Sequence, residues 1–198
     1  MSVSPDNVIT VRSPYNVPQA EIIRFLNAKK GWIEANLNKN SLLRNVFGEV
    51  MSGRTILVCG REVGLCVDKT GIEGIFNDNV RVRDIKNLKK VYVSALGDQF
   101  LKIAESIASR CGMRAASWGF RSYRSRWGCC DGENRITFNY KILMLPERLQ
   151  TYIIVHELCH TRRRDHSPAF NRLVLSVLPQ KSVLERELKD YSFLARMY

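Results

Sequence analysis

All three histidines of this 198-residue chain, His156, His160 and His166, lie within one stretch of eleven residues. The first two belong to the sequence His-Glu-Leu-Cys-His. In a helix, residues four apart lie one turn above each other, so His156 and His160 can bind one metal ion. Glu157 then lies at the edge of that face, where a carboxylate can act as a general base toward water. This pattern predicts a metal-dependent hydrolase, and imidazole ligands favour zinc as the metal.

His166 is the predicted third ligand. It lies six residues beyond His160, and on a continuous helix it would face away from the metal. The helix must therefore end between the two histidines. Ser167 is a good N-cap and Pro168 a good first residue for a following helix, so His166 is expected on a short turn between two helices. Three protein ligands and an open fourth position are typical of catalytic zinc sites.

The length and composition predict one α+β domain over residues 1–198, with an antiparallel sheet beside the helix that carries the histidines. We expect a strand and helix in an N-terminal accessory segment (1–50), a β-meander and a long helix (51–110), and a zinc-binding core (111–198). The sequence contains no run of 18 apolar residues, so no membrane-spanning helix is expected. The N-terminus lacks the basic region and apolar core of a secretory signal. The six cysteines contain no Cys-x-x-Cys pair, so reduced thiols and a cytoplasmic location are expected.

Hydrophobic periodicity and turn residues divide the chain into elements. Helices are predicted from Pro18 to about Leu37, ending at Asn38–Ser41, and over residues 88–110, from Pro146 through the histidines, 168–178 and 182–197. Strands are predicted at 7–12, at 55–59, 62–67, 72–76 and 79–83 as an antiparallel meander, and at 118–127 and 135–142 as a hairpin.

The net charge of +12 favours anionic partners, among them nucleic acid and nucleotides. Arginines gather in the predicted hairpin and after the histidine helix, interleaved with aromatic residues: Arg121, Arg124, Arg126, Arg135, Arg162, Arg163 and Arg164, with Trp118, Tyr123 and Trp127. This pattern fits a nucleic-acid surface and equally a solvated strand face. Arg126 or Tyr140 could stabilise a developing oxyanion, and Arg124 is a further candidate for substrate binding.

The segment from Arg121 to Phe170 resembles the YgjP-like metal-dependent hydrolases, which are zincin-type metallopeptidases related more distantly to the SprT-like proteases. The resemblance rests on Arg124–Cys129, Ile136–Asn139, Pro146, Tyr152–His160, His166–Ser167 and Phe170. It implies a zincin fold with zinc at His156, His160 and His166 and with Glu157 as the base. Two features depart from known patterns. Cys130 stands where the family commonly has Ser, and Arg163 stands where metzincins need Gly.

Three functions remain open at this point. The first is a zinc-dependent peptidase that acts on a peptide or protein. The second is a metal-dependent nucleoside triphosphate hydrolase, although no Gly-rich phosphate loop is visible. The third is a nucleic-acid-associated protease or binding protein.

Overall fold

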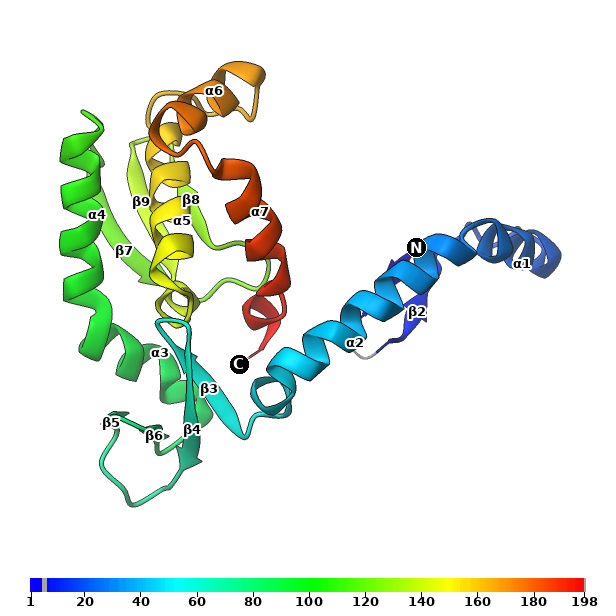
Figure 1. Ribbon diagram of the computed structural model, residues 1–198, viewed down its shortest axis with the longest axis horizontal. Coiled ribbons are helices and arrows are strands. Elements are labelled where there is room, and N and C mark those ends of the chain that lie inside the picture. Colours follow the sequence, from blue (N-terminus) through cyan, green and yellow to red (C-terminus); the bar gives the residue numbers. More distant parts are fainter. Residues whose placement is uncertain (5–6, 198) are drawn as a thin grey trace. The chain divides into compact units, whose positions relative to one another are not determined.

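The computed structural model describes residues 1–4 and 7–197 (Figure 1). The chain forms two compact units, residues 1–51 and 52–198. Mixed α/β structure with small sheets makes up the second unit, and all the predicted metal ligands belong to it. Among the described residues, no helix combines the length and the apolar character that crossing a bilayer requires.

The first unit consists of a short antiparallel strand pair and two helices. Strands β1 (Ser2–Val3) and β2 (Ile9–Thr10) pair, and α1 (Gln19–Ala28) and α2 (Lys30–Ser52) follow. The predicted helix end at Asn38–Ser41 is wrong, because α2 runs through it. Asn40 donates to the Ser4 carbonyl and to Asn7 Oδ1, and Ser41 donates to the Leu37 carbonyl, so these polar side chains do not compete with the helix.

The second unit begins with a four-stranded sheet in the order β3-β4-β6-β5. Its strands are β3 (Thr55–Val58), β4 (Arg61–Val67), β5 (Gly74–Ile75) and β6 (Asn79–Val82). The predicted antiparallel meander is wrong, because β4 and β6 pair in parallel. The β3–β4 turn has positive φ at Cys59 and Gly60, as tight hairpins require. Its amides donate to the carbonyls of Leu143 and Met144, so the turn docks on the segment that precedes the histidine helix.

The long helix predicted at residues 88–110 is present as three consecutive pieces. These are α3 (Leu88–Tyr92), a π-helical segment (Val93–Gly97) and α4 (Asp98–Arg110). Phe100, Ala104 and Ile107 of α4 are buried, at the spacing of one helical face.

A three-stranded sheet in the order β7-β9-β8 follows α4 in the chain. Its strands are β7 (Ser117–Arg121), β8 (Gly128–Cys130) and β9 (Arg135–Asn139). The predicted hairpin of 118–127 with 135–142 is wrong, because β7 pairs with β9 in parallel and β8 makes the antiparallel hairpin. The buried Asn139 amide donates to the carbonyls of Tyr123 and Arg126, so the chain between β7 and β8 leaves the sheet. The two sheets of the second unit are therefore mixed, not antiparallel.

Helix α5 (Glu147–His160) lies at the centre of this unit and contacts α4, α6, α7 and β8 (Figure 1). It is apolar on most sides, as a helix packed all round must be, with Ile154, Val155, Leu158 and Cys159 almost completely buried. Helices α6 (Pro168–Val177) and α7 (Lys181–Asp190) follow. Helix α7 ends before the predicted residue 197, and a short 3-10 turn (Leu194–Arg196) takes its place.

Candidate metal centre

The last two turns of α5 carry His156, Glu157 and His160, and the ring centroids of the two histidines lie 4.9 Å apart. Their Nε2 atoms lie 3.3 Å apart. The predicted spacing of four residues therefore brings the two rings together as expected for a helix.

His166 returns to the same point from the chain between α5 and α6. Its Nε2 lies 3.3 Å from Nε2 of His156, and the candidate ligand atoms of all three histidines lie within 4.8 Å of one another. Ser167 caps α6 by accepting the Phe170 amide, and Pro168 is the first helical residue, as predicted. Phe170 packs beneath the cluster, with its ring stacked on His160 at a centroid distance of 4.4 Å.

The protonation of the rings suits metal binding. Burial lowers the pKa of His156 to about 4, and His160 and His166 lower it further. Burial also lowers the pKa of His160, so both rings are neutral at pH 7 and offer lone pairs. Nδ1 of His160 lies 2.9 Å from the Arg163 carbonyl, which can accept only if Nδ1 carries the proton. Nε2 of His160 is then free to bind a cation.

Two of the separations within the cluster fit one tetrahedral ion. Two nitrogens bound at about 2.0–2.1 Å in a tetrahedral site lie roughly 3.4 Å apart. The two measured Nε2 separations of 3.3 Å agree with this value. Three imidazoles this close make a donor set suited to a divalent transition metal.

Glu157 lies between α5 and β8, and it is only 6% exposed. Burial raises the pKa of its carboxyl to about 7, whereas the positive Arg126 and the backbone amide of Cys130 act in the opposite direction. Gly128 makes room for the carboxyl, since a Cβ there would lie 2.6 Å from Oε1 of Glu157. The carboxyl is therefore fixed beside the three histidines and is poised to gain or lose a proton near neutral pH.

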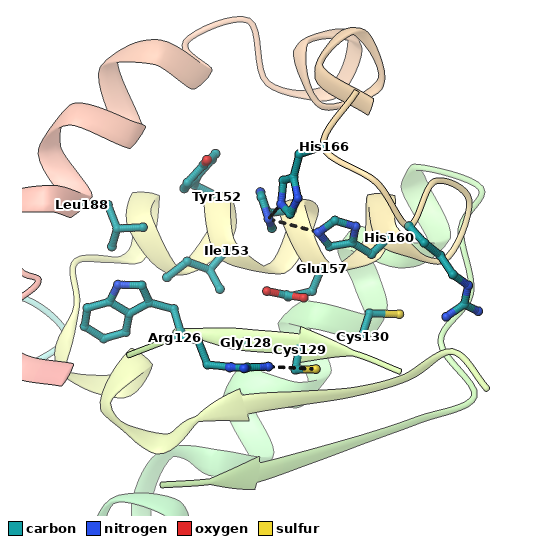
Figure 2. Close-up of a pocket in the computed structure, with 13 residues that line it drawn as sticks. Arg126, Gly128, Cys129, Cys130, Tyr152, Ile153, Glu157, His160, His166 and Leu188 are labelled. Carbon is teal, nitrogen blue, oxygen red and sulfur yellow. Dashed lines mark hydrogen bonds between the residues drawn. The ribbon is translucent and has the colours of Figure 1, made fainter. Parts of the chain in front are cut away.

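A cavity of about 420 Å³ opens in front of the cluster (Figure 2). Part of its wall is apolar, made by Trp127, Ile153 and Leu188 with the ring of Tyr152. Arg126 and Arg164 also line the cavity, together with Cys129 and Cys130. The cavity therefore offers one apolar wall and two positive charges beside the candidate metal site.

Two of the predicted substrate-binding residues do not reach this cavity. Tyr140 is buried at 2% exposure and its ring packs edge-on against Tyr92, 6.4 Å away. Arg124 lines a separate hollow with Lys141 and Arg196. Both expectations assumed that residues 118–127 and 135–142 form one hairpin, and the parallel pairing of β7 with β9 removes that geometry. Arg126 does line the cavity.

Sequence reasoning did not select Gly128, Ile153 and Leu188 as residues of the site. Ile153 lies four residues before Glu157, so its helical spacing would have placed it on the same face. Gly128 and Leu188 come from other elements and have no comparable pattern.

Several of the predicted basic residues have protein partners. Arg135 pairs with Asp131 and Glu133, and Arg162 and Arg164 donate to backbone carbonyls.

Three clustered imidazoles beside a buried carboxylate, on a mixed α/β fold, are typical of metal-dependent hydrolases. The model of the YgjP-like metallopeptidase domain matches residues 1–191, and the chain belongs to this family. It is therefore a hydrolase of the peptidase type that depends on a divalent metal. A comparison with curated proteins finds no match. The crystal structure of the metallopeptidase zymogen of Pyrococcus abyssi abylysin is similar over 45% of this chain and 90% of its own, with 23% identity and a TM-score of 0.42.

Proposed function

We propose that this protein is a zinc-dependent peptidase of the zincin type, in which His156, His160 and His166 hold the ion and Glu157 is the general base. The observation that carries the proposal is the convergence of three Nε2 atoms, two pairs of them 3.3 Å apart, beside a carboxyl that β8 holds in place. The family match over residues 1–191 supports treating the chain as one functional domain.

A divalent ion held by these imidazoles supplies Lewis-acid polarisation of the scissile carbonyl and makes water acidic enough to attack near neutral pH. Glu157 accepts a proton from the attacking water and later donates it to the leaving amine. Burial raises the pKa of this carboxyl, which strengthens it as a base toward water, and its place beside the histidines lets it serve both transfers. The negative oxygen that develops on the carbonyl carbon requires a positive donor, and Arg126 is the side chain we assign to it.

The cavity also suggests how a peptide is oriented. Strand β8 is an edge strand, so its free backbone groups can pair with an extended substrate along the cavity. The apolar wall of Trp127, Ile153 and Leu188 would receive an apolar side chain of that substrate. All six cysteines are free thiols, which supports the predicted cytoplasmic location.

The test combines metal analysis with hydrolysis of a diverse peptide library. We expect about one zinc ion per chain in the wild-type protein and in Glu157→Gln, because the amide leaves the three ligands unchanged. The variant should lose about 10³-fold in kcat/KM. A Glu157→Gln protein that cleaves the same peptide at the wild-type rate would contradict the role of Glu157.

The two other hypotheses from the sequence have no observation in the structure that favours them over peptide hydrolysis. Phosphate release from nucleoside triphosphates, measured with and without metal, would test the second. Binding to DNA and RNA over a range of salt concentrations would test the third, because charge-driven binding weakens steeply with salt.

A further inference from the structure

We propose that Arg164 is a positioning residue that holds the third histidine, His166, at the metal site. The assignment rests on the proposed function, since it assumes that the three imidazoles bind an ion. It concerns the corner, defined here as residues 161–167 between α5 and α6, and the β8–β9 turn, defined as residues 131–134. Arg164 connects the two.

Arg164 makes three hydrogen bonds to the β8–β9 turn. Nη1 donates to the Asp131 carbonyl at 2.5 Å, and Nη2 donates to the Gly132 carbonyl at 2.8 Å and to Oδ1 of Asn134 at 3.0 Å. The planar guanidinium can satisfy several acceptors at once with fixed geometry, which a lysine cannot do. The side chain is therefore held in one orientation, although it lies at the surface.

The turn is built to present these acceptors. The Asp131 carboxylate accepts the backbone amides of Glu133 and Arg135 and pairs with the Arg135 side chain at 2.8 Å. These bonds hold the pKa of Asp131 below its usual range. Asn134 has φ of 59°, a left-handed conformation that Asn tolerates well. The turn is thus held by hydrogen bonds of its own that do not involve Arg164, so it can support the arginine.

The corner needs such a support. Helix α5 ends at His160, and His166 is an exposed residue that the regular hydrogen bonds of a helix do not hold. Arg162 ties the start of the corner to the Gly112 carbonyl at 2.7 Å, at the end of α4. Arg164 lies two residues before His166 and is the nearer of these two attachments. The Arg163 side chain makes no hydrogen bond within the part of the chain that the structure describes. Its replacement by Ala keeps the backbone carbonyl that faces His160, so it offers a control of equal charge.

The same contact joins the two sides of the cavity. The β8–β9 turn follows directly on β8, which packs against Glu157, and the corner carries His166. Loss of Arg164 should therefore widen the range of positions available to His166 without removing any ligand. Outer contacts that orient a metal ligand typically contribute about 10- to 100-fold in metal affinity.

The experiment measures zinc affinity of the full-length protein by competition with a chromophoric chelator, for the wild type, Arg164→Ala and Arg163→Ala. We expect Arg164→Ala to bind zinc about 10-fold or more weakly and Arg163→Ala to match the wild type. Both variants lose one positive charge, but Arg164 lines the cavity and Arg163 does not. Loss of a positive charge beside the site favours a bound cation, so a purely electrostatic effect of Arg164→Ala would strengthen zinc binding, opposite to the result expected here. Melting temperatures with zinc and with EDTA provide a second measurement. If Arg164 only stabilises the fold, Arg164→Ala should lower the melting temperature equally with zinc and with EDTA. If Arg164 positions a ligand, the variant should show a smaller rise in melting temperature on adding zinc than the wild type does.

Equal affinities of Arg164→Ala and Arg163→Ala would overturn the assignment while leaving the proposed function intact. A wild-type protein that binds no zinc would overturn the proposed function and the assignment with it. If Arg164→Ala does not fold, Arg164→Lys and Asn134→Gly serve the same comparison. The first keeps the charge but loses the forked geometry, and the second removes one acceptor. Both should weaken zinc binding by about 2- to 10-fold, and wild-type affinity in both would reject the proposal.

Discussion

The two walls of the cavity are built in different ways. One wall is the end of α5, where His156, Glu157 and His160 lie on a single helix buried on most sides. The other wall is β8 with the chain before and after it, held by bonds from side chains to backbone carbonyls, such as those of Asn139 and Arg164. The first wall carries the chemistry, and the second sets the positions of the groups that approach it. Changes to α5 should therefore abolish function, whereas changes to the second wall should reduce it by degrees.

The largest effect is expected from His160→Ala on the α5 wall. Removing one of three imidazoles leaves too few ligands for a stable catalytic site, so bound zinc should fall to a small fraction of one per chain. Peptidase activity should fall by more than about 10³-fold. Elemental analysis after dialysis, together with the peptide assay, measures both. Retention of stoichiometric zinc by this variant would show that the ion binds elsewhere.

A smaller effect is expected from Gly128→Ala on the β8 wall. The added Cβ would lie 2.6 Å from Oε1 of Glu157, so the carboxyl must move away. A displacement of about 1 Å at a catalytic group can cost on the order of 10²-fold in rate, and the metal should stay bound. Gly119→Ala in β7 is the matched control, because a Cβ there meets no atom within 4 Å. Equal activity of the two variants would contradict the role given to Gly128.

Asn139→Ala should mainly lower stability. It removes the donor for the carbonyls of Tyr123 and Arg126, which then lack their partner in a part-buried setting. We expect a loss of about 2 kcal/mol in the free energy of unfolding, measured by urea denaturation. Thr137→Ala on the same strand should cost less than about 1 kcal/mol and serves as the comparison. If the two losses are equal, Asn139 does not organise this segment.

The smallest effect concerns Lys141, whose amine donates to the carbonyls of Ala195 and Met197 away from the cavity. Burial lowers its pKa from 10.5 to about 8. Between these values the unfolded chain binds more protons, so stability should rise with pH from about 8 to 10.5, on the order of 1 kcal/mol. Lys141→Met should remove this increase. Denaturation curves of both proteins at pH 8 and pH 10 give the free energies of unfolding. The same change between the two pH values in both proteins would refute the role given to Lys141.

The difference between the walls also explains what the sequence could predict. The α5 wall follows from the fixed period of a helix, and the Ser167–Pro168 break follows from capping preferences, so the approach of His156, His160 and His166 to one another was predictable. The second wall depends on which strands pair. Residues 118–127 have a strand-like composition, but β7 ends at Arg121 because the buried Asn139 amide binds the following loop.

Contacts between side chains and distant segments of the backbone could not be predicted from the sequence either. The arginines after His160 suggested an anionic partner, yet Arg162 and Arg164 donate to backbone carbonyls of Gly112, Asp131 and Gly132. A charge pattern alone does not distinguish an arginine that meets a ligand from one that binds its own backbone, because both lie at the surface. The long helix α2 gives a similar case, since Asn40 is satisfied by contacts with Ser4 and Asn7 far away in the sequence.

The most direct test of the metal centre is X-ray absorption at the zinc edge of the purified, zinc-loaded protein. The structure predicts a first shell of three imidazole nitrogens at about 2.0–2.1 Å with one further light atom. Cys129 and Cys130 also line the cavity, so the same spectrum tests the main competing ligands. Sulfur at about 2.3 Å, or fewer than three imidazoles, would contradict the assignment of His156, His160 and His166 as the ligands.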